Sequence, residues 1–334
     1  MSEPSTPDGS LPFPAEILYP RTWTKVPSDG LAERLESSAF AWLEHRGLLY
    51  QPENRRNIAA CHLGDAVARS NPTARSTTRL EFHAKFLGMW FLYEDSIEGI
   101  GTQGHDPRLV SRALTGFWQG PVPSGPLWHW AELGEEMATS MSPSWRRRFG
   151  ARFEAWQYSI ADEAALFKTS GMEASLDAYV AVRLHTLGMC TATDMIEYTQ
   201  GRELPPEVFA DPDIMEIYRI ISTAGLIDND LYCLTKDREH RYPNLVYVLA
   251  RERGLTETQS IQSILVWHDR LVERFTQVER RLRKERAELG VSWWLECVQH
   301  MATGLGAWHH DAPRYRTKHL TREGRMIHVR ISLW

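Results

Sequence analysis

The stretch over residues 229–237, NDLYCLTKD, places side chains that can bind metal at four-residue intervals. In a helix each four-residue step turns only ~40° past a full circle, so Asn229, Cys233 and Asp237 would share one face. An amide oxygen and a carboxylate suit Mg²⁺, which usually completes its shell with water and substrate phosphates. Cys233 is the exception in this ladder, because a thiol is a soft ligand that Mg²⁺ disfavours.

A second acidic cluster, over residues 94–98, directly follows the apolar, aromatic run over residues 89–93. On a helix Glu94, Asp95 and Glu98 would lie near one edge, where crowded carboxylates repel one another unless a cation neutralises them. Taken alone, the pattern is also typical of an exposed helix end. It indicates a metal site only in combination with the ladder at residues 229–237.

Hydrogen-bond donors suited to an anion accompany both acidic segments. Arg183 stands in an otherwise apolar helical stretch, and a buried arginine requires an anionic partner. Lys236 directly precedes Asp237, and Arg314 with Tyr315 forms a pair near the C-terminus that could donate several hydrogen bonds to one anion. Each of these residues alone is as readily structural as functional.

The elements that must position these side chains are predicted to be helices. Apolar residues recur at three- and four-residue steps over residues 31–49, 78–97, 145–168, 176–199, 212–236, 256–289 and 292–309. Period-two alternation is scarce, and clusters of Gly, Pro and charged residues separate the segments. The pattern predicts a single all-α domain over residues 26–318. A proline-rich flexible leader over residues 1–25 and a C-terminal tail over residues 319–334 would flank it.

Composition excludes several classes of function. The formal net charge of −5 gives no basic field for nucleic acid or an anionic membrane surface. No apolar run approaches the ~20 residues of a membrane span. The four cysteines form no CxxC pair, and the N-terminus lacks the order of a signal peptide, so we expect a reduced, cytoplasmic protein.

The four groups of residues, in this order, resemble motifs of the class I terpene synthases of bacteria and fungi. Residues 94–98 resemble the aspartate-rich DDxxD/E motif, and residues 229–237 resemble the NDxxSxxxE triad, including the lysine before its last ligand. Arg183 stands where that family has its diphosphate-sensing arginine. Arg314 and Tyr315 match the terminal RY pair, with Trp308 shortly before it. The resemblance covers residues from about 30 to 316.

The resemblance implies a helical bundle around a central apolar active-site cavity, and it assigns roles to residues. Three Mg²⁺ ions, with Mn²⁺ as an alternative, would be held by Glu94, Asp95, Glu98, Asn229, Cys233 and Asp237. The diphosphate would be bound by Arg183, Lys236, Arg314 and Tyr315. The hydrocarbon pocket would comprise Phe86, Trp90, Phe91, Thr186, Leu187, Gly188 and Trp308. For Trp90 and Phe91, plain core packing is an equal alternative.

The activity implied is ionisation of an acyclic prenyl diphosphate, with farnesyl diphosphate expected, and cyclisation of the carbocation to a sesquiterpene with release of diphosphate. Aromatic faces would stabilise the cation through cation–π attraction of about 0.5–2 kcal/mol each. Many relatives form dimers, so a homodimer is an open expectation.

Three departures from the family pattern keep alternatives open. Glu94 replaces Asp, Cys233 replaces Ser or Thr, and Asp237 replaces Glu, so the metal site is either re-tuned or impaired. One alternative is a catalytically silent relative that binds a diphosphate ligand or a partner protein. Another is a prenyl-elongating synthase, which needs two aspartate-rich motifs where the sequence has one candidate. A di-iron bundle is excluded because the sequence contains no Glu-x-x-His.

Overall fold

The chain folds as a bundle of α-helices. The computed structural model describes residues 16–100, 106–120, 126–170, 173–315 and 330–333, with the backbone alone for 97–100, 126, 167–170 and 330–333. Its helices are α1 (Leu31–His45), α2 (Pro52–Cys61), α3 (Leu63–Ser70), α4 (Thr77–Ile100), α5 (Pro107–Leu114), α6 (Pro126–Ser140), α7 (Pro143–Ser170), α8 (Leu176–Thr186), α9 (Met189–Gln200), α10 (Pro212–His240), α11 (Leu245–Arg253), α12 (Glu257–Lys284) and α13 (Ser292–Asp311). The prediction of an all-α fold is confirmed.

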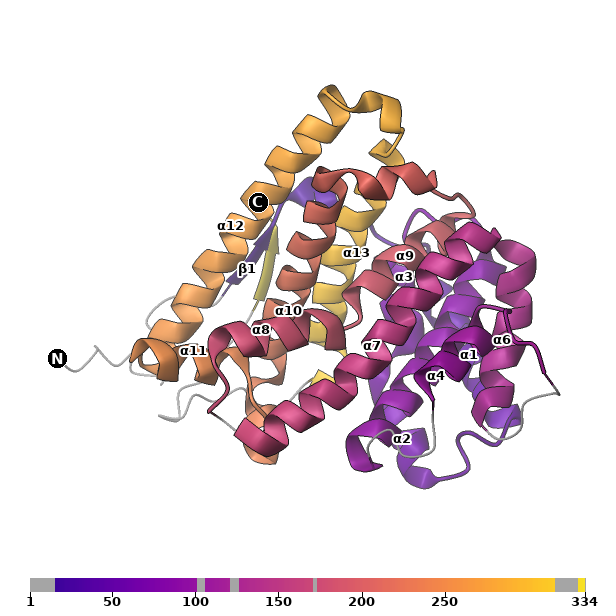
Figure 1. The fold of residues 1–334 in the computed structure, drawn as a ribbon, viewed down its shortest axis with the longest axis horizontal. Helices are drawn as coiled ribbons and strands as arrows, with labels where there is room; N and C mark the ends of the chain where they lie inside the picture. The colour runs from indigo at the N-terminus through magenta and orange to yellow at the C-terminus, as the bar shows by residue number, and fades with distance from the viewer. Residues whose placement is uncertain (1–15, 101–105, 121–125, 171–172, 316–329, 334) are drawn as a thin grey trace.

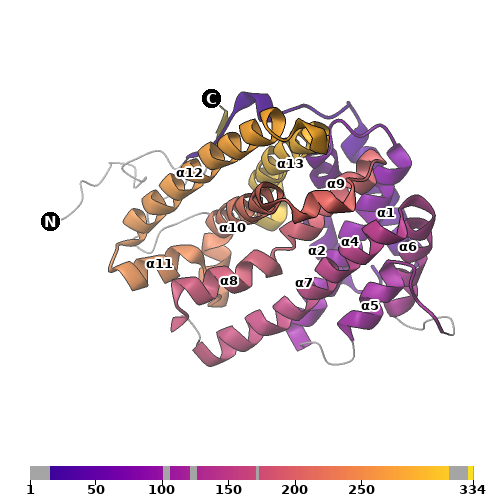
Figure 2. The same cartoon turned by 45° about the horizontal axis from the view of Figure 1, so that its top comes forward.

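Two groups of helices face each other across the middle of the molecule. In Figure 1, α1, α4 and α6 lie on one side and α8, α10 and α12 on the other. The helix α7 packs against both α4 and α8, and α13 packs against α3 and α10, so these two helices join the groups. Figure 2 shows α7 and α8 running side by side along the same edge of the bundle. The arrangement brings α4 and α10, which carry the two acidic segments, into one structure.

The segment predicted as a single helix over residues 176–199 is broken into α8 and α9. Gly188, at the break, has a φ of 65°, in the left-handed region that favours glycine. A Cβ at this position would collide with the ring of Trp90 on α4. The break therefore needs glycine for both its backbone conformation and its close approach to α4, and it leaves Leu187 and Gly188 facing the interior.

Both ends of α10 are fixed by side chains that cap helices. Asp211 accepts a hydrogen bond from the backbone N–H of Asp213 at 2.9 Å, and Pro212 occupies the first helical position. Beyond the C-terminal end, Asn244 caps α11 and also donates to the Asp237 carboxylate at 2.8 Å. The two caps set the position of residues 229–237 along the bundle.

The described part of the expected flexible leader is packed into the fold. The strand β1 (Glu16–Tyr19) pairs in parallel with β2 (Arg330–Leu333); β1 lies beside α12 in Figure 1, and β2 packs against α13. Ile17, Tyr19 and Trp23 are buried, and the Tyr19 hydroxyl donates to Asp228 on α10 at 3.0 Å. The five prolines before position 21 deny this segment a helix but not a docked strand. Within the described residues, no helix combines the length and apolarity needed to cross a membrane.

Candidate active site

One cavity of about 420 Å³ collects most of the residues selected from the sequence. Its volume lies in the range of about 300–1,000 Å³ that is usual for small-molecule sites. The selected residues that line it are Phe86, Trp90, Phe91, Glu94, Arg183, Thr186, Leu187, Gly188, Asn229, Cys233, Lys236, Asp237, Trp308, Arg314 and Tyr315. They come from α4, α8, the break after α8, α10, α13 and the short 3-10 helix Pro313–Tyr315. Segments far apart in the sequence thus form one site.

The wall of the cavity made by α10 carries the ladder of candidate metal ligands. Asn229, Cys233 and Asp237 all line the cavity, as the four-residue interval predicts. Burial raises the pKa of the Cys233 thiol, so the side chain stays a neutral thiol. Burial, with a smaller contribution from the nearby Asp230 carboxylate, raises the pKa of Asp237 to about 7. Asp230, the other carboxylate within residues 229–237, pairs with Arg183 instead.

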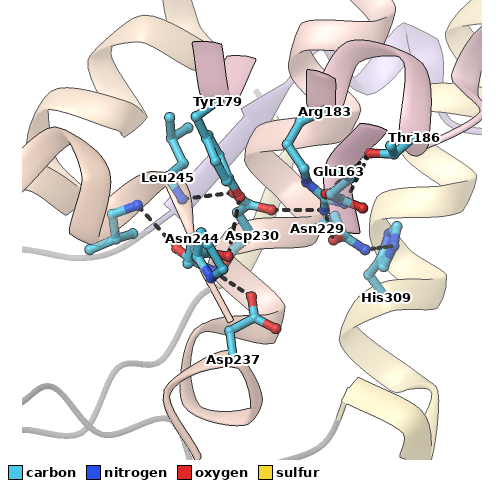
Figure 3. A network of polar contacts seen from close by, with 12 residues as sticks. Glu163, Tyr179, Arg183, Thr186, Asn229, Asp230, Asp237, Asn244, Leu245 and His309 are labelled. Carbon is cyan, nitrogen blue, oxygen red and sulfur yellow. Dashed lines mark hydrogen bonds and ion pairs between the residues drawn. The ribbon is translucent and has the colours of Figure 1, made fainter. Parts of the chain in front are cut away.

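Asp230 anchors Arg183 rather than facing the cavity. Its carboxylate is 1% exposed and accepts hydrogen bonds from the Tyr179 hydroxyl at 2.5 Å and the backbone N–H of Leu245 at 2.8 Å. Arg183 donates to the same carboxylate at 3.1 Å. Figure 3 shows this carboxylate between Tyr179 and Arg183. The residue after Asn229 therefore fixes the arginine that the sequence analysis assigned to diphosphate.

Arg183 lies between two carboxylates and an amide. Its Nη2 also donates to the Asn229 Oδ1 at 2.9 Å, and its Nη1 donates to the Glu163 Oε1 at 3.1 Å (Figure 3). Burial alone would lower the pKa of this guanidinium, but Glu163 and Asp230 raise it well above its ordinary value. Arg183 is therefore a permanent cation at the cavity wall.

The wall made by α4 and the C-terminal segment is held by a different ion pair. Glu94 lines the cavity, whereas Asp95 accepts from Arg314 Nη2 at 2.9 Å and from the Asn57 amide at 3.4 Å. The Arg314 guanidinium lies 5.0 Å from the centre of the Phe91 ring. Asp95 is thus engaged with the arginine assigned to the diphosphate. The side chain of Glu98 falls outside the described residues, so its role as a ligand stays a prediction.

Aromatic rings form the apolar part of the cavity. Trp90 lines the cavity and also packs on Trp156, with ring centroids 3.6 Å apart, and against Phe86 at 5.6 Å. Trp308 is fixed by its indole N–H, which donates to the carbonyl of Cys61 at 2.6 Å. Trp90 therefore both packs in the core, against Trp156, and lines the cavity.

Sequence reasoning missed four polar residues that line the cavity, His83, Glu163, Tyr242 and His309, and two of them, Glu163 and His309, contact Arg183 and Asn229. Glu163 of α7 belongs to no recognisable motif, and only its tertiary contact with Arg183 reveals it. His309 follows Trp308 and could have been placed by helical periodicity. Its Nδ1 lies 2.9 Å from the Leu305 carbonyl, which assigns the proton to Nδ1 and leaves Nε2 to accept from the Asn229 amide at 3.4 Å. Burial lowers the pKa of His309 to about 4, so the ring is neutral.

The donor set fits a hard divalent cation. Asn229, Asp237 and Glu94 present amide or carboxylate groups to the same cavity, the chemistry that Mg²⁺ prefers. Cys233, as a neutral thiol, adds no charge to such a site. Across the described ranges, no three His, Cys, Asp or Glu side chains gather closely enough to hold a metal. The oxygen donors therefore stand on separate walls of the cavity, with α4 supplying one set and α10 the other.

The chain is similar in sequence and in fold to known proteins. The family model described as "Terpene synthase family 2, C-terminal metal binding" matches residues 85–274. Pentalenene synthase of Streptomyces avermitilis is 25% identical over 299 residues, covering 85% of this chain and 88% of its own length. The (−)-β-caryophyllene synthase of Saccharothrix espanaensis is 26% identical, with 85% and 78% covered. The fold is similar to that of the linalool/nerolidol synthase from Streptomyces clavuligerus, with a TM-score of 0.75 at 18% identity, over 87% of this chain and 99% of that one.

Proposed function

The chain belongs to terpene synthase family 2, and on this basis we propose that it is a Mg²⁺-dependent class I cyclase whose substrate is farnesyl diphosphate. Members of the family are lyases that act on prenyl diphosphates, and the matched segment includes the C-terminal two thirds of α4 and all of α10. What the family leaves open is the metal ion, the length of the prenyl chain and the product.

The observation that carries the proposal is that one cavity is lined both by charged residues, here called its polar part, and by aromatic rings, its aromatic part. Arg183, Lys236 and Arg314 line it together with Phe86 and Trp308. A prenyl diphosphate combines the matching features, because a dense negative charge terminates a long apolar chain. A site for it must therefore be polar where the diphosphate lies and apolar where the chain lies.

In the polar part, some residues would donate hydrogen bonds to the diphosphate leaving group and others would bind the metal. Arg183, Lys236, Arg314 and Tyr315 would donate hydrogen bonds to the diphosphate oxygens. Mg²⁺, three ions by analogy with the family, would be held by Asn229, Asp237, Glu94 and the neighbouring acidic residues. When bound, the metal supplies positive charge that stabilises the departing diphosphate.

The aromatic part would keep water from the allyl cation and stabilise it. Ring faces attract a cation without acting as nucleophiles, by about 0.5–2 kcal/mol each. Trp308, Phe86 and Trp90 line the cavity and are immobilised by the contacts described above. Phe91 is the weakest candidate, since the Arg314 guanidinium already lies over its ring.

Farnesyl diphosphate is proposed because a relative of this family uses it. The name of the Saccharothrix espanaensis relative states that it cyclises (2E,6E)-farnesyl diphosphate. A C15 substrate would make the product a sesquiterpene.

The test is incubation of the purified protein with geranyl, farnesyl and geranylgeranyl diphosphates, each with Mg²⁺, with Mn²⁺ and with chelator. Gas chromatography with mass spectrometry would identify the volatile products. We expect a cyclic C15 product from farnesyl diphosphate only when metal is present. Failure of all three substrates with folded protein would instead favour a catalytically silent relative, and a longer linear prenyl diphosphate would favour an elongating synthase.

A further inference from the structure

Glu163 places a carboxylate of this chain inside the site proposed for the substrate's anion. It comes from α7, and its side chain lines the cavity beside Arg183 and Thr186 of α8. Its Oε1 accepts from Arg183 Nη1 at 3.1 Å and from the Thr186 hydroxyl at 3.4 Å (Figure 3). The arginine that would bind diphosphate therefore already has an anion at its cavity side.

The two carboxylates bound to Arg183 are not equivalent. Asp230 is 1% exposed, lies away from the cavity and is tied by the Tyr179 hydroxyl and a backbone N–H. Glu163 is 15% exposed and lines the cavity. Of the two carboxylates bound to Arg183, only Glu163 lines the cavity in which a ligand would lie. Asp230 is thus the permanent anchor of Arg183, and Glu163 is the replaceable partner.

A diphosphate that approaches Arg183 brings like charge to Glu163. The Glu163 carboxylate already accepts from the Arg183 Nη1, and two anions a few ångströms apart repel each other. Binding therefore requires Glu163 to give up Arg183. In return, the carboxylate keeps the buried guanidinium paired whenever the site holds no ligand, and an unpaired buried charge would be unfavourable.

We propose that Glu163 is a resident counter-anion of Arg183, which occupies the diphosphate-binding donors in the free protein and competes with diphosphate for them. The inference rests on the proposed function, since it takes the ligand to be a diphosphate. Glu163 lowers the affinity of the site for diphosphate, and by returning to Arg183 it promotes release of the diphosphate product. It is a positioning residue and does not react.

The test is isothermal titration calorimetry of inorganic diphosphate in the presence of Mg²⁺. Glu163→Gln keeps the size of the side chain and its hydrogen bond to Arg183 but removes the charge, so we expect diphosphate to bind about five- to tenfold tighter. Diphosphate should also become a stronger product inhibitor of turnover by a similar factor. Tighter binding is informative because damage to the fold would weaken binding instead.

Asp162→Asn is the matched control. Asp162 precedes Glu163 on α7 and is exposed, so this variant removes the same charge without changing the cavity. Its affinity for diphosphate should stay within about twofold of the wild type. If Glu163→Gln does not fold, Glu163→Ala removes the carboxylate without a polar group and should shift affinity in the same direction.

Equal or weaker diphosphate binding by a folded Glu163 variant, beside a wild type that binds, would overturn the counter-anion role alone. Arg183→Ala, which lacks the guanidinium, is the reference for lost diphosphate binding. A wild type that binds diphosphate no better than Arg183→Ala would contradict the proposed function, and this inference with it.

Discussion

The two walls that carry the candidate metal ligands are built in opposite ways. On the α10 wall, the residues around the ligands are tied to the scaffold, since Asp230 accepts from Tyr179 and Leu245 and Asp237 accepts from Asn244. On the α4 wall, Asp95 is bound mainly to Arg314, another residue of the site itself, at 2.9 Å. One wall is therefore fixed by residues outside the site and the other by a pair within it.

The difference indicates which wall must rearrange when substrate binds. Arg314 cannot donate fully to a diphosphate while it is paired with Asp95, and Asp95 cannot turn to a metal while it holds Arg314. On the α10 wall, Arg183 has to leave Glu163 and Asp237 has to ionise, whereas the Asn229 Oδ1 that accepts from Arg183 keeps a second lone pair for a metal. We infer that α10 provides a preformed surface, and that the α4 wall completes the site once ligand breaks the pair between Asp95 and Arg314.

The largest effect should come from removing the anchor of the fixed wall. Asp230→Asn would lose the buried ion pair with Arg183 and place an amide against the N–H of Leu245. We expect the free energy of unfolding to fall by about 3–5 kcal/mol. Asp95→Asn on the other wall breaks a more exposed pair, and its cost should be about 1 kcal/mol. Urea denaturation of both variants measures the two costs, and similar values would contradict the contrast between the walls.

On the α4 wall, function should suffer more than stability. Arg314→Ala removes a charged donor proposed for the diphosphate, so turnover should fall about 100-fold, whereas Tyr315→Phe, which removes one hydroxyl, should lower turnover about tenfold. Steady-state assays of diphosphate release check both values. Turnover by Arg314→Ala close to that of the wild type would mean that Arg314 only holds Asp95.

The features of the two walls that depend on a single helix could be predicted from the sequence. The four-residue interval places Asn229, Cys233 and Asp237 on one face of α10, and this needs no knowledge of other helices. Apolar periodicity likewise indicated α1, α4, α7, α10, α12 and α13, whereas α2, α3, α5, α6 and α11 lie outside the segments that it marked. The separate roles of neighbours such as Asn229 and Asp230 were not predictable, because the partner of Asp230 lies on α8.

Tertiary contacts account for what the sequence did not reveal. Glu163 acquires its role only because α7 and α8 pack side by side, and the break at Gly188 depends on the ring of Trp90. Tyr19 lies in a proline-rich segment whose composition indicates a flexible leader, yet it is buried against α10. None of these contacts has a local sequence signature.

The pH dependence of stability can sharpen the description of the α10 wall. The pKa of Asp237 is raised to about 7 by burial and Asp230, above its ordinary value of 3.8 in the unfolded chain. Between these values the folded protein binds more protons than the unfolded chain, so this group makes the free energy of unfolding fall as pH rises from about 4 to about 7.

Asp237→Asn should flatten that slope in the metal-free protein. Urea denaturation at about pH 5 and about pH 8 measures the free energy of unfolding of the variant and of the wild type. Asp228, whose pKa is also raised to about 7, contributes a slope of the same sign to both proteins, so the difference between them reports on Asp237. Because a metal needs the ionised carboxylate, Mg²⁺ affinity of the wild type should rise with pH up to about 7. An unchanged slope in the variant would mean that Asp237 is ionised throughout.

The smallest effect is expected at Cys233. Cys233→Ser replaces a soft, neutral thiol on the cavity wall with a hydroxyl oxygen, so Mg²⁺ affinity should rise about two- to fivefold. Titration calorimetry with Mg²⁺ measures the change. Cys190→Ser is the control, because Cys190 lies on α9, contacts Ser222 and does not line the cavity. Equal or weaker Mg²⁺ binding by Cys233→Ser would count against Cys233 facing the metal.

The most direct test of the account is the rate of diphosphate release from farnesyl diphosphate by the wild type and by Asn229→Ala, with and without Mg²⁺. We predict that the wild type releases diphosphate only with Mg²⁺, and that Asn229→Ala is at least about 1,000-fold slower while its thermal unfolding is nearly unchanged. Equal, Mg²⁺-dependent release by a folded Asn229→Ala protein would contradict the claim that the α10 wall holds the metal that drives ionisation.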